Sequence, residues 1–451
     1  MAIPQGPLPL AAGGRVWQQV RSFAAPAPPQ RLRWDALQVT LTVVVAMQVW
    51  RVQELFPVIA FYGLPIAATL AAMLVFWLDR DPRRRLTNLD SHVVGAALGI
   101  LLLAWLSVPG SLYPGFSAEF LLKDYCRTVV LMLLVAASVR GLADVRRLAW
   151  VQIAGVTLFS TVIMARSEIG SDGRLHAVAY YDANDLATLI VCTLPLVLYL
   201  WRRNTGLAAR LLLAAVTVLL MVTLGRTGSR GGFLGFLAVA AYLLLRLRAV
   251  STAKRAGAVA LLAILLVAVA KDTYFERMET LLHPSTDYNW SGQSETGRVE
   301  LWKRGIGYML GHPVLGVGVG AFPMAEGTIS PEAQQRYGRG VKWLAPHNAF
   351  IQIGAELGVL GLILFLALLR GAFRVLSRVQ RGAGDEARFV AQALTASLVG
   401  FSVTAIFLSQ AYWAYFYTLL GMSLGVARAA FAEQVLRHRA PLSSGMARYE
   451  R

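Results

Sequence analysis

Long apolar runs recur along the whole chain and are separated by short polar stretches. Runs of about 17–25 residues have the length that an α-helix needs to cross the hydrocarbon core of a bilayer. Hydrophobic residues make up 56% of the chain and charged residues only 15%, whereas soluble domains average about 25% charged. The pattern predicts an all-α integral membrane protein.

We expect about twelve membrane-spanning helices. Their predicted positions are 36–50, 55–78, 91–108, 119–139, 149–165, 185–201, 210–225, 232–247, 256–270, 347–369, 389–409 and 411–432. This places nine spans in 35–270 and three in 347–433. Residues 1–34 and 434–451 are then terminal tails, and 271–346 is a large loop between the ninth and tenth spans. The Pro-rich tail 1–34 does not have the form of a signal peptide.

Basic residues cluster in every second loop, which predicts the orientation of the chain. The clusters are Arg80 with Arg83 to Arg85, Arg140 with Arg146 and Arg147, Arg202 with Arg203, Arg246 with Arg248, Lys254 and Arg255, and Arg370 with Arg374, Arg378, Arg381 and Arg388. Short cytoplasmic loops carry such an excess of Lys and Arg. We therefore expect both termini in the cytoplasm, and we attribute the net charge of +18 to topology. A nucleic-acid partner is not indicated.

The loop 271–346 is expected on the outer surface as a small folded domain. It has as many acidic as basic residues and includes helix-like stretches such as 297–310. Glycine and proline turns lie around 312–320, in "GHPVLGVGVGAF". This glycine repeat lacks the strand and helix of a dinucleotide-binding unit, so a tight surface turn is the better interpretation.

The stretch "GRTGSRGG", Gly225–Gly232, must break a helix. One continuous helix over 210–247 would be roughly 57 Å long, about twice the thickness of the hydrocarbon core. Arg226 and Arg230 would share a face in any helical turn and repel each other, unless an anion lay between them. Arginine matches phosphate geometry, and Ser229 and the glycines could add donors. The alternative is that both arginines reach to outer headgroups.

A second polar entrance on the same side is "GRLHAVAYYDANDLA", Gly173–Ala187. Arg174 adds a positive charge facing the same compartment. Asp182 or Asn184 could cap the helix that follows, or could belong to a site. In the third motif, starting at "ETGRVELWKRG", Thr296 can cap a helix that carries Arg298.

The fourth motif is "LAPHNAFIQIGAELGVLG", Leu344–Gly361. His347 lies at the outer mouth of the tenth span, and an imidazole can take up a proton near neutral pH. Asn348 and Gln352 can bind sugar hydroxyls or hold the histidine. Glu356 falls on the opposite helix face, roughly 13 Å deeper, which indicates an indirect role.

Metal or redox chemistry is not indicated. Cys126 and Cys192 both lie in apolar surroundings, so neither a disulfide framework nor a zinc site is predicted. The Asp-x-Asp pair, Asp79 and Asp81, falls on the cytoplasmic side and is interpreted as a solvated loop. We predict neither a metal site nor a cofactor.

Taken together, the four motifs resemble those of the O-antigen ligase/polymerase superfamily. "HNAFIQIGAELGVLG" is similar to the segment that closes its large periplasmic loop, and "RTGSRGG" to its Ser-Arg-Gly turn. "GRVELWKRGIGYMLGHPVLGVGVGAF" resembles its Arg…Trp…Pro-x-x-Gly-x-Gly-x-x-Phe element. "YDANDLA" resembles its Asn-containing entry to a span, although "DAND" stands where many relatives have Asn-Pro-Asn.

The resemblance implies a metal-independent, inverting glycosyltransferase of the bacterial inner membrane, with a GT-C-like architecture and an active site facing the periplasm. The donor would be a glycan on undecaprenyl pyrophosphate, and the acceptor a sugar hydroxyl of lipid A–core oligosaccharide. His347 would be the catalytic base. Arg226, Arg230 and Arg298, with Arg174 as a further candidate, would bind the pyrophosphate. Ser229, Asn348, Gln352 and Asn184 would line the site.

Other activities remain open at this point. An O-antigen polymerase would use a second polyprenyl-linked glycan as acceptor, and a protein O-oligosaccharyltransferase would use Ser or Thr. A lipid-linked oligosaccharide flippase should have charged residues at mid-membrane depth in several spans and an internal repeat. Neither feature is found in the sequence, which favours an enzyme working at one membrane face.

Overall fold

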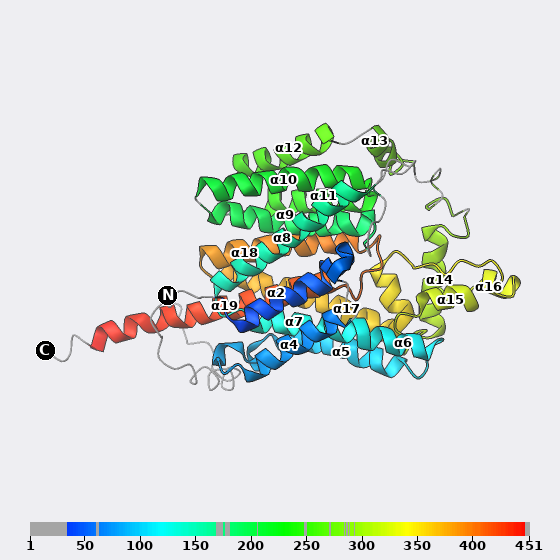
Figure 1. The fold of residues 1–451 in the computed structure, drawn as a ribbon, viewed down its shortest axis with the longest axis horizontal. Coiled ribbons are helices and arrows are strands. Elements are labelled where there is room, and N and C mark those ends of the chain that lie inside the picture. Colours follow the sequence, from blue (N-terminus) through cyan, green and yellow to red (C-terminus); the bar gives the residue numbers. More distant parts are fainter. Residues whose placement is uncertain are drawn as a thin grey trace, which may run out of the picture.

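The computed structural model describes residues 34–59, 63–167, 175, 181–204, 206–247, 250–269, 272–283, 285, 287, 289–292 and 294–446. These residues form helices joined by turns and loops, and no strand occurs among them. Most of the helices lie side by side in an elongated bundle, and α14, α15 and α16 lie beyond one end of it (Figure 1). The predicted all-α class is confirmed for this part of the chain.

The helices of the first half are α2 (Ala36–Gln48), α3 (Val52–Leu55), α4 (Leu64–Leu78), α5 (Ser91–Ser107), α6 (Pro114–Phe120), α7 (Cys126–Ser138), α8 (Leu142–Arg166) and α9 (Ala183–Arg203). Those of the second half are α10 (Leu207–Thr227), α11 (Arg230–Arg246), α12 (Thr252–Val269), α13 (Asp272–Glu279), α14 (Arg298–Gly311), α15 (Phe322–Thr328), α16 (Pro331–Gln335), α17 (Ala349–Gly382), α18 (Asp385–Thr404) and α19 (Ala414–Met446). Short 3₁₀ turns cover Pro57–Ile59, Pro82–Arg84 and Leu86–Asn88.

A helix lies at each of the twelve predicted span positions, but the second, fourth and tenth spans are less regular than expected. The second begins only at Leu64, after a 3₁₀ turn, and the fourth contains the π-helical turn Leu121–Tyr125 between α6 and α7. Five described helices, α8, α9, α10, α17 and α18, are long and apolar enough to cross a membrane. The chain is therefore a multi-pass membrane protein, and the total of twelve spans stays a prediction.

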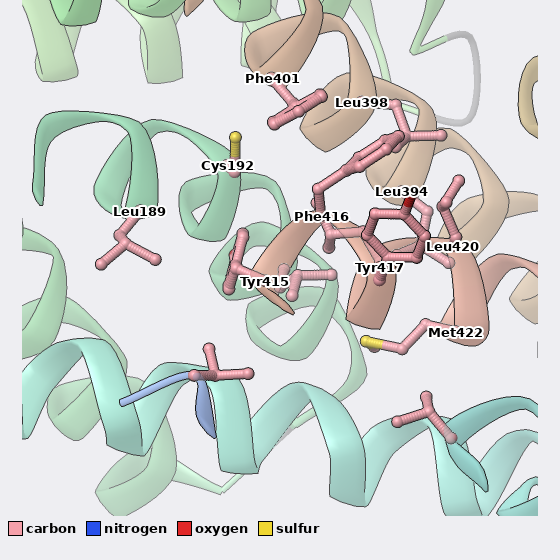
Figure 2. Close-up of a cluster of buried hydrophobic side chains, with 14 of the residues drawn as sticks. Leu189, Cys192, Leu394, Leu398, Phe401, Tyr415, Phe416, Tyr417, Leu420 and Met422 are labelled. Atoms are coloured by element: carbon pink, nitrogen blue, oxygen red, sulfur yellow. The ribbon is translucent and has the colours of Figure 1, made fainter. Parts of the chain in front are cut away.

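A tightly packed core lies where α9, α18 and α19 meet. Figure 2 shows Cys192 of α9 among the side chains of α18 and α19. The rings of Phe401 and Phe416 are stacked with centroids 4.1 Å apart. The hydroxyls of Thr193 and Tyr415 are 2.7 Å apart, so this buried polar pair is satisfied. The core fixes the end of α18 and the start of α19, and thus the loop that joins them.

The helices beyond the bundle are held together by one partly buried arginine. Arg304 on α14 donates to Glu326 on α15 at 2.6 Å and to Glu332 on α16 at 3.1 Å. The Tyr308 hydroxyl also donates to Glu326 at 2.9 Å. Because Glu326 is buried, these bonds keep its charge compensated. The described part of 271–346 is folded as expected, and the proposed domain boundaries stay predictions.

The Asp-x-Asp pair is not a simple solvated loop. Asp81 accepts from the Arg83 side chain at 2.6 Å, and Asp79 pairs with the buried Arg84. Both carboxylates are therefore neutralised by neighbouring arginines, which the sequence interpretation did not foresee.

Candidate active site

The loop between α18 and α19, residues 405–413, contacts the outer-surface motifs of the sequence. The backbone N–H of His347 donates to the Ser409 hydroxyl at 2.9 Å. Two residues later, Ala349 N donates to the carbonyl of Ala405 at 2.8 Å. His347 itself has a φ of 46°, in the left-handed region that non-glycine residues rarely adopt. The loop thus holds His347 in a strained conformation of the kind that clusters at functional sites.

The two amides after His347 have structural roles. The Asn348 side chain caps α17 by accepting from Phe350 N at 2.9 Å and from Ile351 N at 3.1 Å. The Gln352 side-chain oxygen accepts from Ala411 N at 3.2 Å. Asn348 thus fixes the first turn of α17, and Gln352 connects the helix to the loop. Their contact with a sugar substrate stays a prediction.

Helix α14 approaches His347 from the other side. The Arg298 guanidinium donates to the Phe407 carbonyl at 3.2 Å, and the Trp302 indole N–H donates to the Pro346 carbonyl at 2.9 Å. The helix begins at Arg298 after Gly297, without a side-chain cap. The prediction that Thr296 caps it was therefore wrong, because the chain turns into the helix one residue later. Arg298 contacts the same loop as His347, and its role in binding pyrophosphate stays a prediction.

The predicted break in "GRTGSRGG" is confirmed. Helix α10 ends at Thr227, Gly228 has a φ of 58°, and α11 begins at Arg230. Ser229, only 2% exposed, caps α11 by accepting from Gly232 N at 3.1 Å. The capping explains why a serine occurs here, and its place in a site wall stays a prediction.

Small residues allow this turn to pack closely. A Cβ added to Gly231 would lie 3.0 Å from Cβ of Phe407, in the same loop that contacts Arg298. A Cβ added to Gly232 would lie 2.5 Å from that of Ala187 on α9. The turn is thereby pressed against both the loop and the start of α9.

Arg226 and Arg230 lie on different helices, so they do not share a helical face. Arg230 is already neutralised, since its guanidinium donates to Thr280 at 2.8 Å and forms an ion pair with Asp287. Burial alone would raise the pKa of Asp287, but hydrogen bonding and the charge of Arg230 lower it below its usual value. Arg226 is half-buried, and within the described residues its side chain has no hydrogen-bond or ion-pair partner.

The start of α9 completes the arrangement. Asp182 and Asp185 form a capping box, which confirms the capping interpretation of "DAND". The Asn184 amide donates to Asp182 at 3.2 Å, and the Gln410 amide from the loop donates to Asp185 at 2.7 Å. Arg174 lies outside the described residues, so the prediction that it helps to bind pyrophosphate is not tested by the structure.

Glu356 has the indirect position expected from its helical phase. It is buried and accepts from Gly320 N at 3.0 Å, in the glycine repeat that follows α14. Helix α17 kinks at Gly358, which has a φ of 71°, and Val359 N donates to the Pro313 carbonyl at 2.9 Å. The glycine repeat is thus a tight turn, as predicted, but its centre is buried against α17 and does not lie on the surface.

The surroundings of His347 favour its neutral form. Burial lowers the pKa of the imidazole, and the nearby charge of Arg298 lowers it further, while Asp182 acts in the opposite direction. The net pKa lies below the ordinary value of 6.5. A neutral imidazole is the form that can accept a proton, so His347 is prepared for general-base chemistry near neutral pH.

The surroundings of His347 predict how the rate of transfer depends on pH. Transfer catalysed by neutral His347 should fall on the acid side with an apparent pKa below 6.5. Arg298→Ala removes a charge that lowers the pKa, so the acid limb should move to higher pH. Asp182→Asn removes a charge that raises it and should move the limb to lower pH.

The same shifts should occur in the pH dependence of His347 modification by diethyl pyrocarbonate, which reacts with neutral imidazole and is followed by mass spectrometry. This readout does not require catalytic activity. Unchanged profiles in both variants would contradict the electrostatic account.

The sequence interpretation missed the loop "AIFLSQAYW", 405–413, and the carboxylate of Asp287. Ser409 and Gln410 are polar residues at the junction of the last two predicted spans, which was the available signal. No group of three or more His, Cys, Asp or Glu suited to hold a metal ion occurs among the described residues.

Residues 215–366 match a protein-family model described as O-Antigen ligase. The matched segment runs from α10 into α17 and includes Arg226, Arg230, Arg298 and His347. No curated protein sequence matches the chain. Over this segment, which carries three of the four outer-surface motifs, the chain is similar to the O-antigen ligase family.

Proposed function

We propose that the protein is an O-antigen ligase of the bacterial inner membrane. It transfers a glycan from undecaprenyl pyrophosphate to a sugar hydroxyl of lipid A–core oligosaccharide at the periplasmic face, with both termini in the cytoplasm. The single observation that carries the proposal is a histidine held beside Arg298 by the 405–413 loop. A base and an arginine in one place are what transfer from a pyrophosphate donor needs.

The reaction is a single displacement. His347 takes the proton of the acceptor hydroxyl as its oxygen forms a bond to the anomeric carbon of the donor. The bond from that carbon to the pyrophosphate oxygen breaks on the opposite face, and undecaprenyl pyrophosphate leaves. The configuration at the anomeric carbon is inverted.

The arginines stabilise the leaving group. As the glycosidic bond breaks, negative charge grows on the pyrophosphate, and preorganised donors at such a position contribute about 3–4 kcal/mol. Arg226 is the first candidate because its guanidinium is half-buried and unpaired within the described residues. Arg298 can contribute from beside His347, whereas Arg230 must first exchange its partner Asp287 for phosphate.

The donor supplies the driving force, because the pyrophosphate is already an activated leaving group. Neither a nucleotide nor a metal ion is needed for the step as written. The fork-shaped guanidinium groups bind phosphate oxygens bidentately, a geometry that a lysine does not reproduce.

The second candidate is the O-antigen polymerase, since the matched superfamily includes ligases and polymerases. Both would use the same base and the same pyrophosphate site and would differ in the acceptor. A protein O-oligosaccharyltransferase would differ in the same way, with Ser or Thr as acceptor. A flippase is disfavoured because the arginines and His347 gather at one end of the bundle.

The test is to identify the product made by the full chain in lipid nanodiscs. The protein is supplied with undecaprenyl-pyrophosphate glycan and lipid A–core, in the absence of ATP. Mass spectrometry should find the glycan attached to the core sugars. Longer glycans on the polyprenyl carrier would instead establish the polymerase, and an absence of any transfer would contradict both.

A further inference from the structure

The segment from Arg336 to Trp343, "RYGRGVKW", is a strongly charged surface that no step above uses. We call it the basic arm. Arg336, Arg339 and Lys342 are all exposed, and no acidic residue occurs between 333 and 355. The arm therefore presents three positive charges with no acidic residue between them in the sequence.

The cations of the arm are mostly unpaired. Arg336 contacts Glu295 at 2.9 Å, but both side chains are more than half exposed, and such pairs contribute little. Within the described residues, the side chains of Arg339 and Lys342 have no hydrogen-bond or ion-pair partner. Two free cations on one short segment can bind an anionic group.

The arm has a defined shape. Tyr337, Gly338 and Gly340 have φ values of 50°, 73° and 68°, so the chain turns sharply between the cations. Gly338 N donates to the Ala333 carbonyl at 2.8 Å, which ties the turn to α16. At the other end, Trp343 packs on α15, since a Cβ added to Gly327 would lie 2.3 Å from its indole nitrogen.

Two aromatic rings accompany the cations. Tyr337 is 92% exposed, and Trp343 is 56% exposed although part of its ring packs on α15. The exposed parts of both rings are available for contact with a ligand. Tyr and Trp side chains offer large, rigid contact surfaces that carry one polar group, and they lose little conformational entropy on binding. Such surfaces suit sugar rings, which present both C–H groups and hydroxyls.

The arm leads directly to the catalytic histidine. Four residues beyond Trp343 lies His347, a span of at most roughly 14 Å for extended chain. The adjoining helices α15 and α16 lie beyond the end of the bundle (Figure 1). A partner held there projects away from the membrane, which fits an oligosaccharide better than a phospholipid headgroup.

We propose that the basic arm binds the acceptor, an oligosaccharide that carries phosphate or carboxylate groups. Arg339 and Lys342 bind its anionic groups, Tyr337 and Trp343 contact its sugar rings, and the accepting hydroxyl is thereby presented to His347. This inference rests on the proposed glycosyl transfer and names the chemistry of its acceptor.

The test is the double variant Arg339→Ala/Lys342→Ala of the full chain in nanodiscs. We expect KM for the phosphorylated acceptor to rise about tenfold, as two exposed charge contacts are lost. The values of kcat and of KM for the donor should not change. With dephosphorylated lipid A–core, KM for the acceptor should be the same in wild type and in the double variant. High salt should abolish the difference in KM that is seen with the phosphorylated acceptor.

The matched control is Lys303→Ala on α14, which removes an exposed cation of the same outer region that pairs with Glu300. It should leave KM for the acceptor unchanged. An equal rise in this control, or with the dephosphorylated acceptor, would overturn the proposal. The proposal would also be overturned if the double variant lost only its adsorption to anionic phospholipid vesicles and kept the wild-type KM for the acceptor.

Binding of acceptor in the absence of donor separates this inference from the proposed function. Thermophoresis with labelled lipid A–core should show weaker binding for the double variant and for Tyr337→Ala, even if no glycan is ever transferred. Equal binding by wild type and both variants would overturn the arm's role while leaving the transfer reaction intact.

Discussion

Replacing His347 by alanine is expected to lower kcat for glycan transfer by about 10²- to 10⁴-fold, the usual contribution of a positioned general base. The loss should fall on kcat, because the imidazole acts on the acceptor proton as the new bond forms. Binding of the donor should change little, since the arginines remain. Single-turnover kinetics with radiolabelled donor measure the effect.

The matched control for this variant is Ser409→Ala. Ser409 accepts from the backbone of His347, so its loss should loosen the strained conformation without removing the base. A smaller decrease in kcat, with an unchanged acid limb in the pH profile, is expected. Full activity of His347→Ala would show that the base lies elsewhere.

Replacing Arg226 by alanine is expected to reduce kcat/KM for the donor by about 10²- to 10³-fold, the effect of losing one preorganised donor to a developing charge. The physical reason is the free guanidinium: Arg226 is half-buried and has no partner among the described residues. Steady-state kinetics at varied donor concentration provide the measurement.

Two further variants sharpen this comparison. Arg226→Lys keeps the charge but loses the planar fork, so an intermediate effect is expected. Asp287→Asn removes the carboxylate that neutralises Arg230 and should lower KM for the donor if Arg230 also binds phosphate. A rate within twofold of wild type for Arg226→Ala would remove Arg226 from the pyrophosphate site.

Local features of the fold followed from the sequence because their causes are local. A break within Gly225–Gly232 was required by the length of the apolar run, and Asp182 was one of two candidate caps before a helical pattern. The glycine repeat before α15 lacked the flanking elements of a nucleotide fold. In each case the residues that decide the structure are close together in the chain.

Features of the site that depend on distant contacts were not predictable. Ser409 lies 62 residues from His347, and Phe407 lies 109 residues from Arg298. Helical periodicity identifies which face of one helix is apolar, but not which loop that face meets. For the same reason, nothing in "GRTGSRGG" indicated that Arg230 pairs with Asp287.

The kink of α17 shows the same limit within one element. The pattern 347–369 predicts a regular span, and its periodicity gives no reason for a break at Gly358. In the structure its positive φ bends the helix so that Val359 meets the Pro313 carbonyl. Only the three-dimensional partner explains why a glycine is needed there.

The central claim is a single inverting displacement of undecaprenyl pyrophosphate by an acceptor hydroxyl at His347. The anomeric configuration of the new linkage, determined by NMR on product made by the purified protein, tests it most directly. The account predicts inversion relative to the donor, with one undecaprenyl pyrophosphate released for each glycan transferred. A product with retained configuration would contradict it.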